Sequence, residues 1–367
     1  MKNVLICPRK YVQGRGVLKE VGEYLAALGT KPLILWDETV KGVVSDTMSS
    51  SIKEAGLEMI EVMFGGECTE AEAARVAGVA RDQGADIVVG VGGGKILDVA
   101  KAAAVETGLA KVTVPTIAST DSPTSAATVW YNENGKFAGF VCWPSNPDVV
   151  IVDTGVIAKA PVRALVAGMG DALATWVETN AANKTRAVAL SGGSPTMAAM
   201  AIAELCYVTL LEWGVEAKAA VEAGVVTPAV EKIVEANVLL SGLGFESGGL
   251  ATAHMIGNAL SDFDECHNMM HGEKVAFGVM TQLCLDEDLE LEEIDEAVDF
   301  MISVGLPVTF AELNLPEITD EQLRTLGEVT AGEGSLAHNH NFEVTAESVI
   351  DAMIAADGLG KRMKEDG

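Results

Sequence analysis

The sequence is poor in basic residues. Its 367 residues include 25 lysines and arginines against 53 aspartates and glutamates, which gives a formal net charge of -28. A field of this sign repels nucleic acid and anionic membrane surfaces, so we expect neither as a partner. The acidity predicts a well-solvated surface and carries no information about a substrate.

Patterned cysteines and long apolar runs are also absent. The six cysteines are scattered without a C-x-x-C pair or the spacing of a structural zinc site, so we expect reduced side chains. The N-terminal apolar run is too short for a signal peptide and is followed at once by Pro8, Arg9 and Lys10. The uncharged run 187–203 contains glycines and a proline and falls short of a membrane span. These features together predict a cytoplasmic protein.

Two domains are expected from the length and from the change of pattern along the chain. Short β-branched runs predict strands at 4–7, 32–37, 59–64, 86–90, 112–115 and 149–153. Apolar spacing of three to four residues predicts helices between them at 16–28, 43–55, 70–83 and 97–107. This alternation indicates a Rossmann-like α/β domain with a parallel sheet over residues 1–161. The rest, 162–367, has helical periodicity and predicts an all-α domain, with a ligand cleft between the two.

Three consecutive glycines, Gly92, Gly93 and Gly94, lie between a predicted strand and a predicted helix. Glycine lets backbone N–H groups approach a pyrophosphate, and the start of the helix favours negative charge. Lys95 adds a full positive charge. The spacing matches neither G-x-G-x-x-G nor the P-loop, and a tight turn without a ligand is the alternative. We expect a phosphate-binding loop for a nucleotide cofactor.

Asp37 stands at the end of the second predicted strand. An acid at this position can bind ribose hydroxyls and reject a 2′-phosphate, which favours NAD over NADP. Aspartates at strand ends also serve as turn or cap residues, so the position alone leaves both roles open.

A metal site is expected from three residues that lie far apart in the sequence. His254 and His271 are two of only five histidines, and Asp171 follows two glycines spaced by one residue at a helical segment. One carboxylate and two imidazoles suffice for a catalytic zinc with an open position, and they also suit ferrous iron. His267 is interpreted as a loop or supporting residue, and no role is assigned to His338 or His340.

Six segments together resemble the glycerol dehydrogenases, a branch of the iron-containing alcohol dehydrogenase superfamily, and the resemblance covers nearly the whole chain. They are 64–68 (FGGEC), 92–95 (GGGK), 115–121 (PTIASTD), 170–176 (GDALATW), 244–249 (GFESGG) and 271–278 (HGEKVAFG). The resemblance implies a dehydroquinate synthase-like fold, zinc in preference to iron, and an octamer.

The resemblance also implies roles for single residues. It implies that Asp171, His254 and His271 bind the metal, and that Asp121 and His254 touch the substrate. The NAD contacts that it implies are Asp37, Gly94, Lys95, Asp98, Thr116, Ser119, Ser125 and Tyr131.

One position departs from the wider superfamily. Its iron-type members usually carry a histidine four residues after the metal-binding aspartate, and here that position is Thr175. The departure leaves three protein ligands and room for substrate oxygens. In the expected mechanism the metal lowers the pKa of the alcohol and NAD accepts the hydride. Asp121 would then bind the neighbouring hydroxyl and select vicinal diols such as glycerol, although a helix-capping role for Asp121 is also open.

Three other functions were considered. A 3-dehydroquinate synthase or a glycerol-1-phosphate dehydrogenase would share the fold, the cofactor and the metal, but each must bind a substrate phosphate. The only basic residue expected near the metal is Lys274, which favours an unphosphorylated polyol. A catalytically silent nucleotide-binding protein is disfavoured by the intact set of Asp171, His254 and His271.

Overall fold

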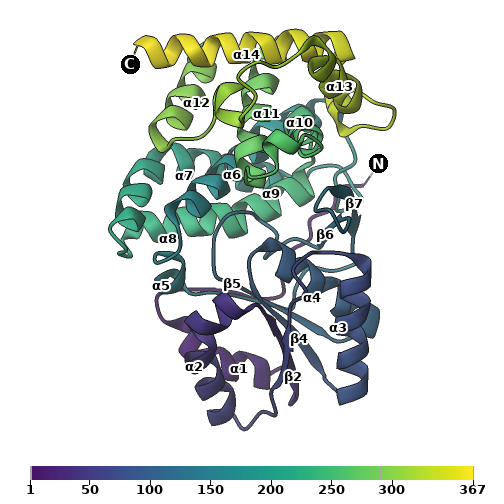
Figure 1. Cartoon of the computed structure of the whole chain (residues 1–367), viewed down its shortest axis with the longest axis vertical. Coiled ribbons are helices and arrows are strands. Elements are labelled where there is room, and N and C mark those ends of the chain that lie inside the picture. Colours follow the sequence, from purple (N-terminus) through teal and green to yellow (C-terminus); the bar gives the residue numbers. More distant parts are fainter. Residues whose placement is uncertain (1, 290, 367) are drawn as a thin grey trace.

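The computed structural model describes residues 2–289 and 291–366 and has an α/β part below a helical part in Figure 1. The α/β part contains a six-stranded sheet with the order β1-β8-β5-β4-β2-β3, and its recorded pairings are all parallel. The strands are β1 (Tyr11–Gln13), β2 (Pro32–Trp36), β3 (Ile60–Met63), β4 (Ile87–Gly92), β5 (Ala110–Pro115) and β8 (Val149–Val152). The expected parallel-sheet domain is confirmed.

Helices cover both faces of this sheet, which explains why its central strands are continuous apolar runs. In β2, Leu33 and Leu35 point to one side and pack with α3 (Glu70–Gln83) and α4 (Gly94–Thr107). Ile34 and Trp36 point to the other side and pack with η1 (Val17–Glu20), α1 (Val21–Ala26) and α2 (Glu38–Glu54).

The N-terminal segment corrects one strand assignment. Residues 4–7 form no strand and instead lie against the helical part, where Val4 N donates to Ser194 O and Ile6 N donates to the Ser247 hydroxyl. The edge strand is β1, which pairs with β8. The β-branched run at 4–7 therefore reflects packing against helices rather than sheet pairing.

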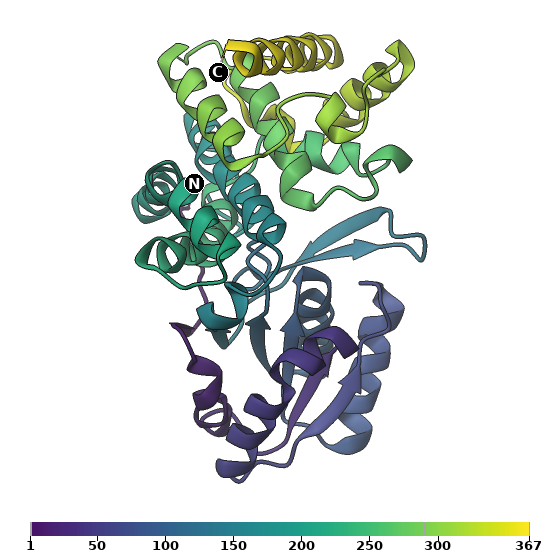
Figure 2. The ribbon, with the colours of Figure 1, turned by 60° about the vertical axis from the view of Figure 1, so that its left-hand side comes forward.

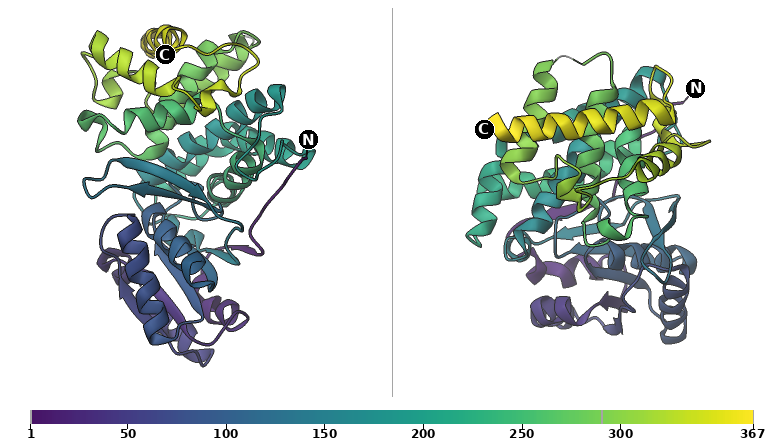
Figure 3. Two further views of the ribbon diagram at one scale, coloured as in Figure 1. Left: turned by 90° about the vertical axis from the view of Figure 1, so that its right-hand side faces the viewer. Right: turned by 45° about the horizontal axis from the view of Figure 1, so that its top comes forward.

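A hairpin in the α/β part was not expected from the sequence. Strands β6 (Ala127–Tyr131) and β7 (Phe137–Cys142) pair antiparallel and form a separate two-stranded sheet. Figures 2 and 3 show this hairpin reaching out between the two parts of the molecule. It forms one side of the cleft described below.

From Thr154 onward the named elements are all helical. The longer ones are α6 (Val162–Thr185), α7 (Met197–Glu222), α8 (Pro228–Glu235), α9 (Ser241–Gly248), α10 (Thr252–Leu260), α11 (His271–Leu285), α12 (Leu291–Val304), α13 (Asp320–Thr330) and α14 (Ala346–Asp366). Short segments join them: α5 (Thr154–Ile157), the π-helical η2 (Ala236–Leu240), η3 (Asp264–Cys266), η4 (Ala311–Leu313) and η5 (Leu336–Asn339). Helix α6 begins at Val162, and the domain boundary at residue 161 stays a prediction.

Helix α7 is long and apolar enough to cross a membrane by length and composition alone. Only 28% of its most apolar 18-residue window is buried within the chain. Met197, Leu205 and Val208 are among the large apolar side chains that it exposes. The uncharged run 187–203 overlaps only the start of α7, because this helix contains isolated glutamates such as Glu204 and Glu212.

Two glycines let α6 approach its neighbours at the backbone. A Cβ on Gly168 would lie 2.0 Å from Ala118 O, and a Cβ on Gly272 would lie 1.8 Å from Ala167 O. Any side chain at either position would push the segments apart. These contacts bring α6 against the loop after β5 and against the first turn of α11.

A buried ion pair on α4 shapes the loop that follows β5. The Lys101 ammonium, which is 1% exposed, lies 2.9 Å from Asp98 Oδ1 and donates to the carbonyls of Ser122, Ser125 and Ala127. Asp98 in turn accepts from the Ser122 hydroxyl. Helix α4 therefore holds the loop 121–127 through charges that water does not reach.

Replacing Lys101 by Met should destabilise the protein by about 3 kcal/mol or more, because it leaves a buried carboxylate without its partner and three carbonyls without a donor. Chemical denaturation followed by circular dichroism measures the loss. Lys53→Met, at an exposed position in the last turn of α2, is the control and should change little. An unchanged midpoint for Lys101→Met would mean that the ammonium is not needed to hold the loop.

Candidate metal centre and cofactor cleft

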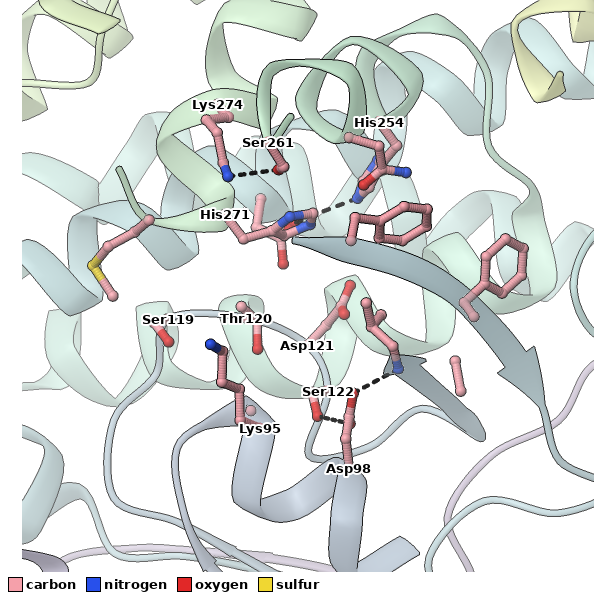
Figure 4. A pocket seen from close by; sticks show the side chains of 18 of the residues that line it. Lys95, Asp98, Ser119, Thr120, Asp121, Ser122, His254, Ser261, His271 and Lys274 are labelled. Atoms are coloured by element: carbon pink, nitrogen blue, oxygen red, sulfur yellow. Dashed lines mark hydrogen bonds and ion pairs between the residues drawn. The ribbon is translucent and has the colours of Figure 1, made fainter. Parts of the chain in front are cut away.

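A pocket of about 400 Å³ lies between the carboxyl edge of the sheet and the helical part. One wall comes from the start of α4, the loop after β5 and the β6–β7 hairpin, and the other from α9, α10 and α11. Figure 4 shows Lys95 and Asp121 on the first wall, facing His254, His271 and Lys274 on the second. The expected cleft therefore contains the glycine loop and the predicted metal ligands together.

Asp171, His254 and His271 converge in this pocket. Asp171 Oδ1 lies 3.4 Å from His254 Nε2 and 3.3 Å from His271 Nε2. Their ligand atoms all lie within 4.8 Å of one another, which suits one ion of the zinc or ferrous class. They come from α6, α10 and α11, so tertiary packing alone brings them together.

The electrostatics of the three residues favour a cation. Asp171 Oδ1 is buried and accepts no hydrogen bond from the described residues. Burial alone would raise the pKa of Asp171, but His271 and His254 outweigh it and hold that pKa well below its usual range. Burial alone would lower the pKa of His254, whereas the Glu178 and Asp171 carboxylates raise it well above its ordinary value. A metal ion between the ligands would satisfy the unpartnered oxygen.

Glu178 is a functional residue that the sequence analysis missed. Its Oε2 lies 2.5 Å from His254 Nδ1, and its Oε1 accepts the backbone N–H groups of Ala251 and His254. This contact fixes the His254 ring with Nε2 toward Asp171, an arrangement that commonly orients metal-binding histidines. Glu178 lies seven residues after Asp171 on α6, which is two turns on one face, and that spacing was the available signal.

Asp121 lines the same pocket from the opposite wall. Its Oδ2 accepts the Ser241 hydroxyl at 2.8 Å. Burial raises the pKa of Asp121 well above its usual range, the nearby Asp171 carboxylate adds to this, and the Ser241 hydrogen bond opposes it. Its carboxyl group therefore lies in the pocket, where it can form a hydrogen bond with a ligand.

Thr175 adds no ligand to the three-residue cluster. Its side chain is fully buried, and its hydroxyl lies 3.0 Å from the Ser241 hydroxyl. A Cβ on Gly244 would lie 2.4 Å from Thr175 Cγ2, so the space around this position is filled by α9. The number of protein ligands stays a prediction.

The glycine loop contributes Gly94 and Lys95 directly to the pocket. Gly93 is the N-cap of α4, and Gly92 has φ 153, where a Cβ would lie 2.6 Å from Ile96. The Lys95 ammonium lies 2.6 Å from Glu67 Oε2 and 4.7 Å from the centre of the Tyr131 ring. Open backbone N–H groups at the start of a 14-residue helix suit a pyrophosphate.

The other residues expected to bind the cofactor fall into two groups. Asp98, Ser119, Ser125 and Tyr131 line the pocket. Asp37 and Thr116 lie at the carboxyl edge of the sheet outside its lining, where Asp37 Oδ1 accepts from Val40 N and caps α2. The capping role is thus present, and the contact with a ribose stays a prediction.

Two ammonium groups line the pocket, one expected from the glycine loop and one expected near the metal. Lys95 joins Lys274, which is buried and donates to the Ser261 hydroxyl at 2.6 Å. Burial lowers the pKa of Lys274. His267 also lines the pocket, whereas His338 is exposed and His340 is bonded to the Thr252 hydroxyl outside the lining.

Comparison with known proteins fits this arrangement. The family model described as iron-containing alcohol dehydrogenase matches residues 8–154. The chain is 44% identical to glycerol dehydrogenase of Escherichia coli over 366 residues, covering all of both chains. It belongs to the iron-containing alcohol dehydrogenase family.

Two further proteins are similar to this chain. Glycolaldehyde reductase of Halobacterium salinarum is 44% identical over 365 residues, again covering all of both chains. The crystal structure of glycerol dehydrogenase from Schizosaccharomyces pombe matches with a TM-score of 0.95 and 36% identity, covering 100% of this chain and 93% of that one. The family, the fold class and the oxidoreductase activity expected from the sequence are confirmed.

Glu178→Gln should weaken metal binding by about 10- to 100-fold, because the amide cannot both keep the backbone contacts and orient His254 as the carboxylate does. Competition with a chromogenic chelator measures the dissociation constants of zinc and ferrous iron. Glu54→Gln, at the exposed end of α2, is the matched control. Equal affinities for the two variants would remove Glu178 from the site.

Proposed function

We propose that this chain is an NAD-dependent dehydrogenase that oxidises glycerol and small vicinal diols to hydroxyketones. The observation that carries the proposal is that Asp121 faces the cluster of Asp171, His254 and His271 across one pocket, which the glycine loop also lines. One hydroxyl of a diol would lie at the metal and the next would reach Asp121. A relative named glycerol dehydrogenase with full coverage supports this substrate.

The reaction removes a hydride and a proton from one carbinol. When bound, the metal supplies Lewis-acid polarisation of the hydroxyl and the nicotinamide accepts the hydride. Asp171, His254 and His271 would hold the metal, and Glu178 would keep the His254 ring in place. Gly94 and Lys95 would bind the cofactor pyrophosphate.

We propose zinc as the metal and NAD as the cofactor. A ligand set of one carboxylate and two imidazoles fits zinc and also ferrous iron, and zinc rests on the resemblance to glycerol dehydrogenases. Asp37, at the end of β2, supports NAD over NADP because it would repel a 2′-phosphate.

Reduction of a small hydroxyaldehyde is a second candidate. It is favoured by the full-length similarity to a glycolaldehyde reductase. A 2-hydroxyaldehyde offers a carbonyl for the metal and a hydroxyl for Asp121, so the same site runs in the reverse direction. The pocket is less suited to binding a phosphorylated substrate, because no arginine is among its lining residues and Lys95 is already paired with Glu67.

We also propose that the chain acts in the cytoplasm as a homo-oligomer, with an octamer implied by resemblance. The exposed apolar side chains of α7 support association, because Met197 is 91% exposed and Leu205 is 54% exposed. Light scattering after size-exclusion chromatography measures the oligomer.

The purified protein should reduce NAD with glycerol and 1,2-propanediol, lose that activity on chelation, and regain it when zinc is added. Absorbance at the NADH band follows turnover, with glycerol 1-phosphate, glycolaldehyde plus NADH, and NADP as comparisons. Turnover that survives full removal of the metal contradicts the mechanism. Turnover of only the phosphorylated alcohol supports the rival function instead.

The His271→Ala variant should remain folded but lose the metal, because it lacks one of three ligands. Its kcat/KM should fall by at least about 100-fold. Metal content, circular dichroism and kinetics are measured on the same preparation. His338→Ala, at an exposed position, is the matched control and should keep both metal and activity. Full activity in His271→Ala would exclude this residue from the site.

A further inference from the structure

A buried chain of three hydroxyl and carboxyl groups joins the helical part to the pocket. Thr175 Oγ1 on α6 lies 3.0 Å from Ser241 Oγ, which lies 2.8 Å from Asp121 Oδ2. Thr175 and Ser241 are fully buried, and Asp121 is 9% exposed.

In the ionised form of Asp121, the direction of both hydrogen bonds is fixed. An ionised carboxylate can only accept, so the Ser241 hydroxyl donates to Asp121. The single Ser241 proton is then used, and Thr175 must donate to Ser241 Oγ. Each hydroxyl therefore has one defined orientation as long as Asp121 is ionised.

The hydrogen bond from Ser241 holds one oxygen of Asp121 and leaves the other for a ligand. Oδ2 is engaged by Ser241, while none of the described residues donates a hydrogen bond to Oδ1. Asp121 lines the pocket on the wall opposite His254 and His271. Its second oxygen is thereby left available for a hydrogen bond with a ligand in the pocket.

The local backbone places Ser241 at this point. Ser241 is the first residue of α9 and directly follows the π-helical segment η2, a type of irregularity that is frequent at functional sites. A Cβ on the next residue, Gly242, would lie 1.9 Å from Thr124 Oγ1. The start of α9 is therefore pressed against the loop that carries Asp121.

We propose that Ser241 and Thr175 are positioning residues that orient Asp121 and so set the preference of the enzyme for diols over mono-alcohols. This inference rests on the proposed function. A mono-alcohol would use the metal alone and has no second hydroxyl for Asp121. Loss of these hydrogen bonds should therefore weaken diol turnover selectively.

The experiment compares 1,2-propanediol with 2-propanol, which has a methyl group in place of the second carbinol. Ser241→Ala should lower kcat/KM for the diol by about 10-fold or more, mainly through KM, and change it for 2-propanol by less than about 2-fold. Thr175→Val, which keeps the shape of the side chain, should act in the same direction to a smaller extent. Thr175→Ser retains the hydroxyl and should remain close to the wild type.

Thr330→Val is the matched control for a buried threonine, because the hydroxyl of Thr330 on α13 is buried without a partner. It should leave both substrates unaffected. Metal content and thermal midpoint are measured for each variant, so that a general loss of folding is recognised. If Ser241→Ala does not fold, the pair of Thr175→Val and Thr175→Ser decides the question.

Equal losses for the diol and the mono-alcohol, or a Thr175→Ser variant as impaired as Thr175→Val, would overturn the positioning role. If the wild type does not oxidise 2-propanol, the test is the KM for the diol. A KM that is unchanged in both Ser241→Ala and Thr175→Val would then overturn the positioning role. A wild-type protein that oxidises no diol would instead contradict the proposed function itself. Glycolaldehyde and acetaldehyde with NADH would then replace the two alcohols, since they differ in the same hydroxyl.

Discussion

The burial of negative charge on one face of α6 is the constraint on which the site depends. Asp171 and Glu178 lie in the helical core, where an unpaired carboxylate is costly. Glu178 is satisfied by the backbone and ring of His254. Asp171 has only the two imidazoles beside it and keeps one oxygen without a donor. The helical part is thus arranged to receive a cation.

Close backbone contacts place the buried charges of α6 in one wall of the cleft. Gly272 lets the first turn of α11 lie against α6, which brings His271 to Asp171, and Gly168 lets α6 touch the loop after β5. The α/β part supplies the other wall through the start of α4 and the loop 121–127. Lys101 and Asp98 hold that loop through a buried ion pair, so contacts with α4 join the cofactor loop to the loop that carries Asp121.

Chemistry and selectivity are therefore supported by different elements. The predicted metal ligands are oriented from within the helical part, as in the contact of Glu178 with His254. Asp121 lies on the α/β part but is oriented from the helical part, through Ser241. Substrate preference in this protein then depends on how the two parts meet, whereas metal binding depends on the helical part alone.

The sequence by itself determined the features that local physics encodes. The alternation of runs specified the parallel sheet, and α3 has the bounds 70–83 that its apolar spacing predicted, since Thr69 caps its start and Gly84 its end. Residue types and the family resemblance predicted three metal ligands, Asp171, His254 and His271, and the fold brings these residues together. Only the tertiary structure decided that residues 4–7 leave the sheet, that Glu178 orients His254 and that Ser241 holds Asp121. The contact of Glu178 with His254 and that of Ser241 with Asp121 join residues 76 and 120 positions apart. Local periodicity and capping patterns do not indicate which distant group will pack against a buried charge.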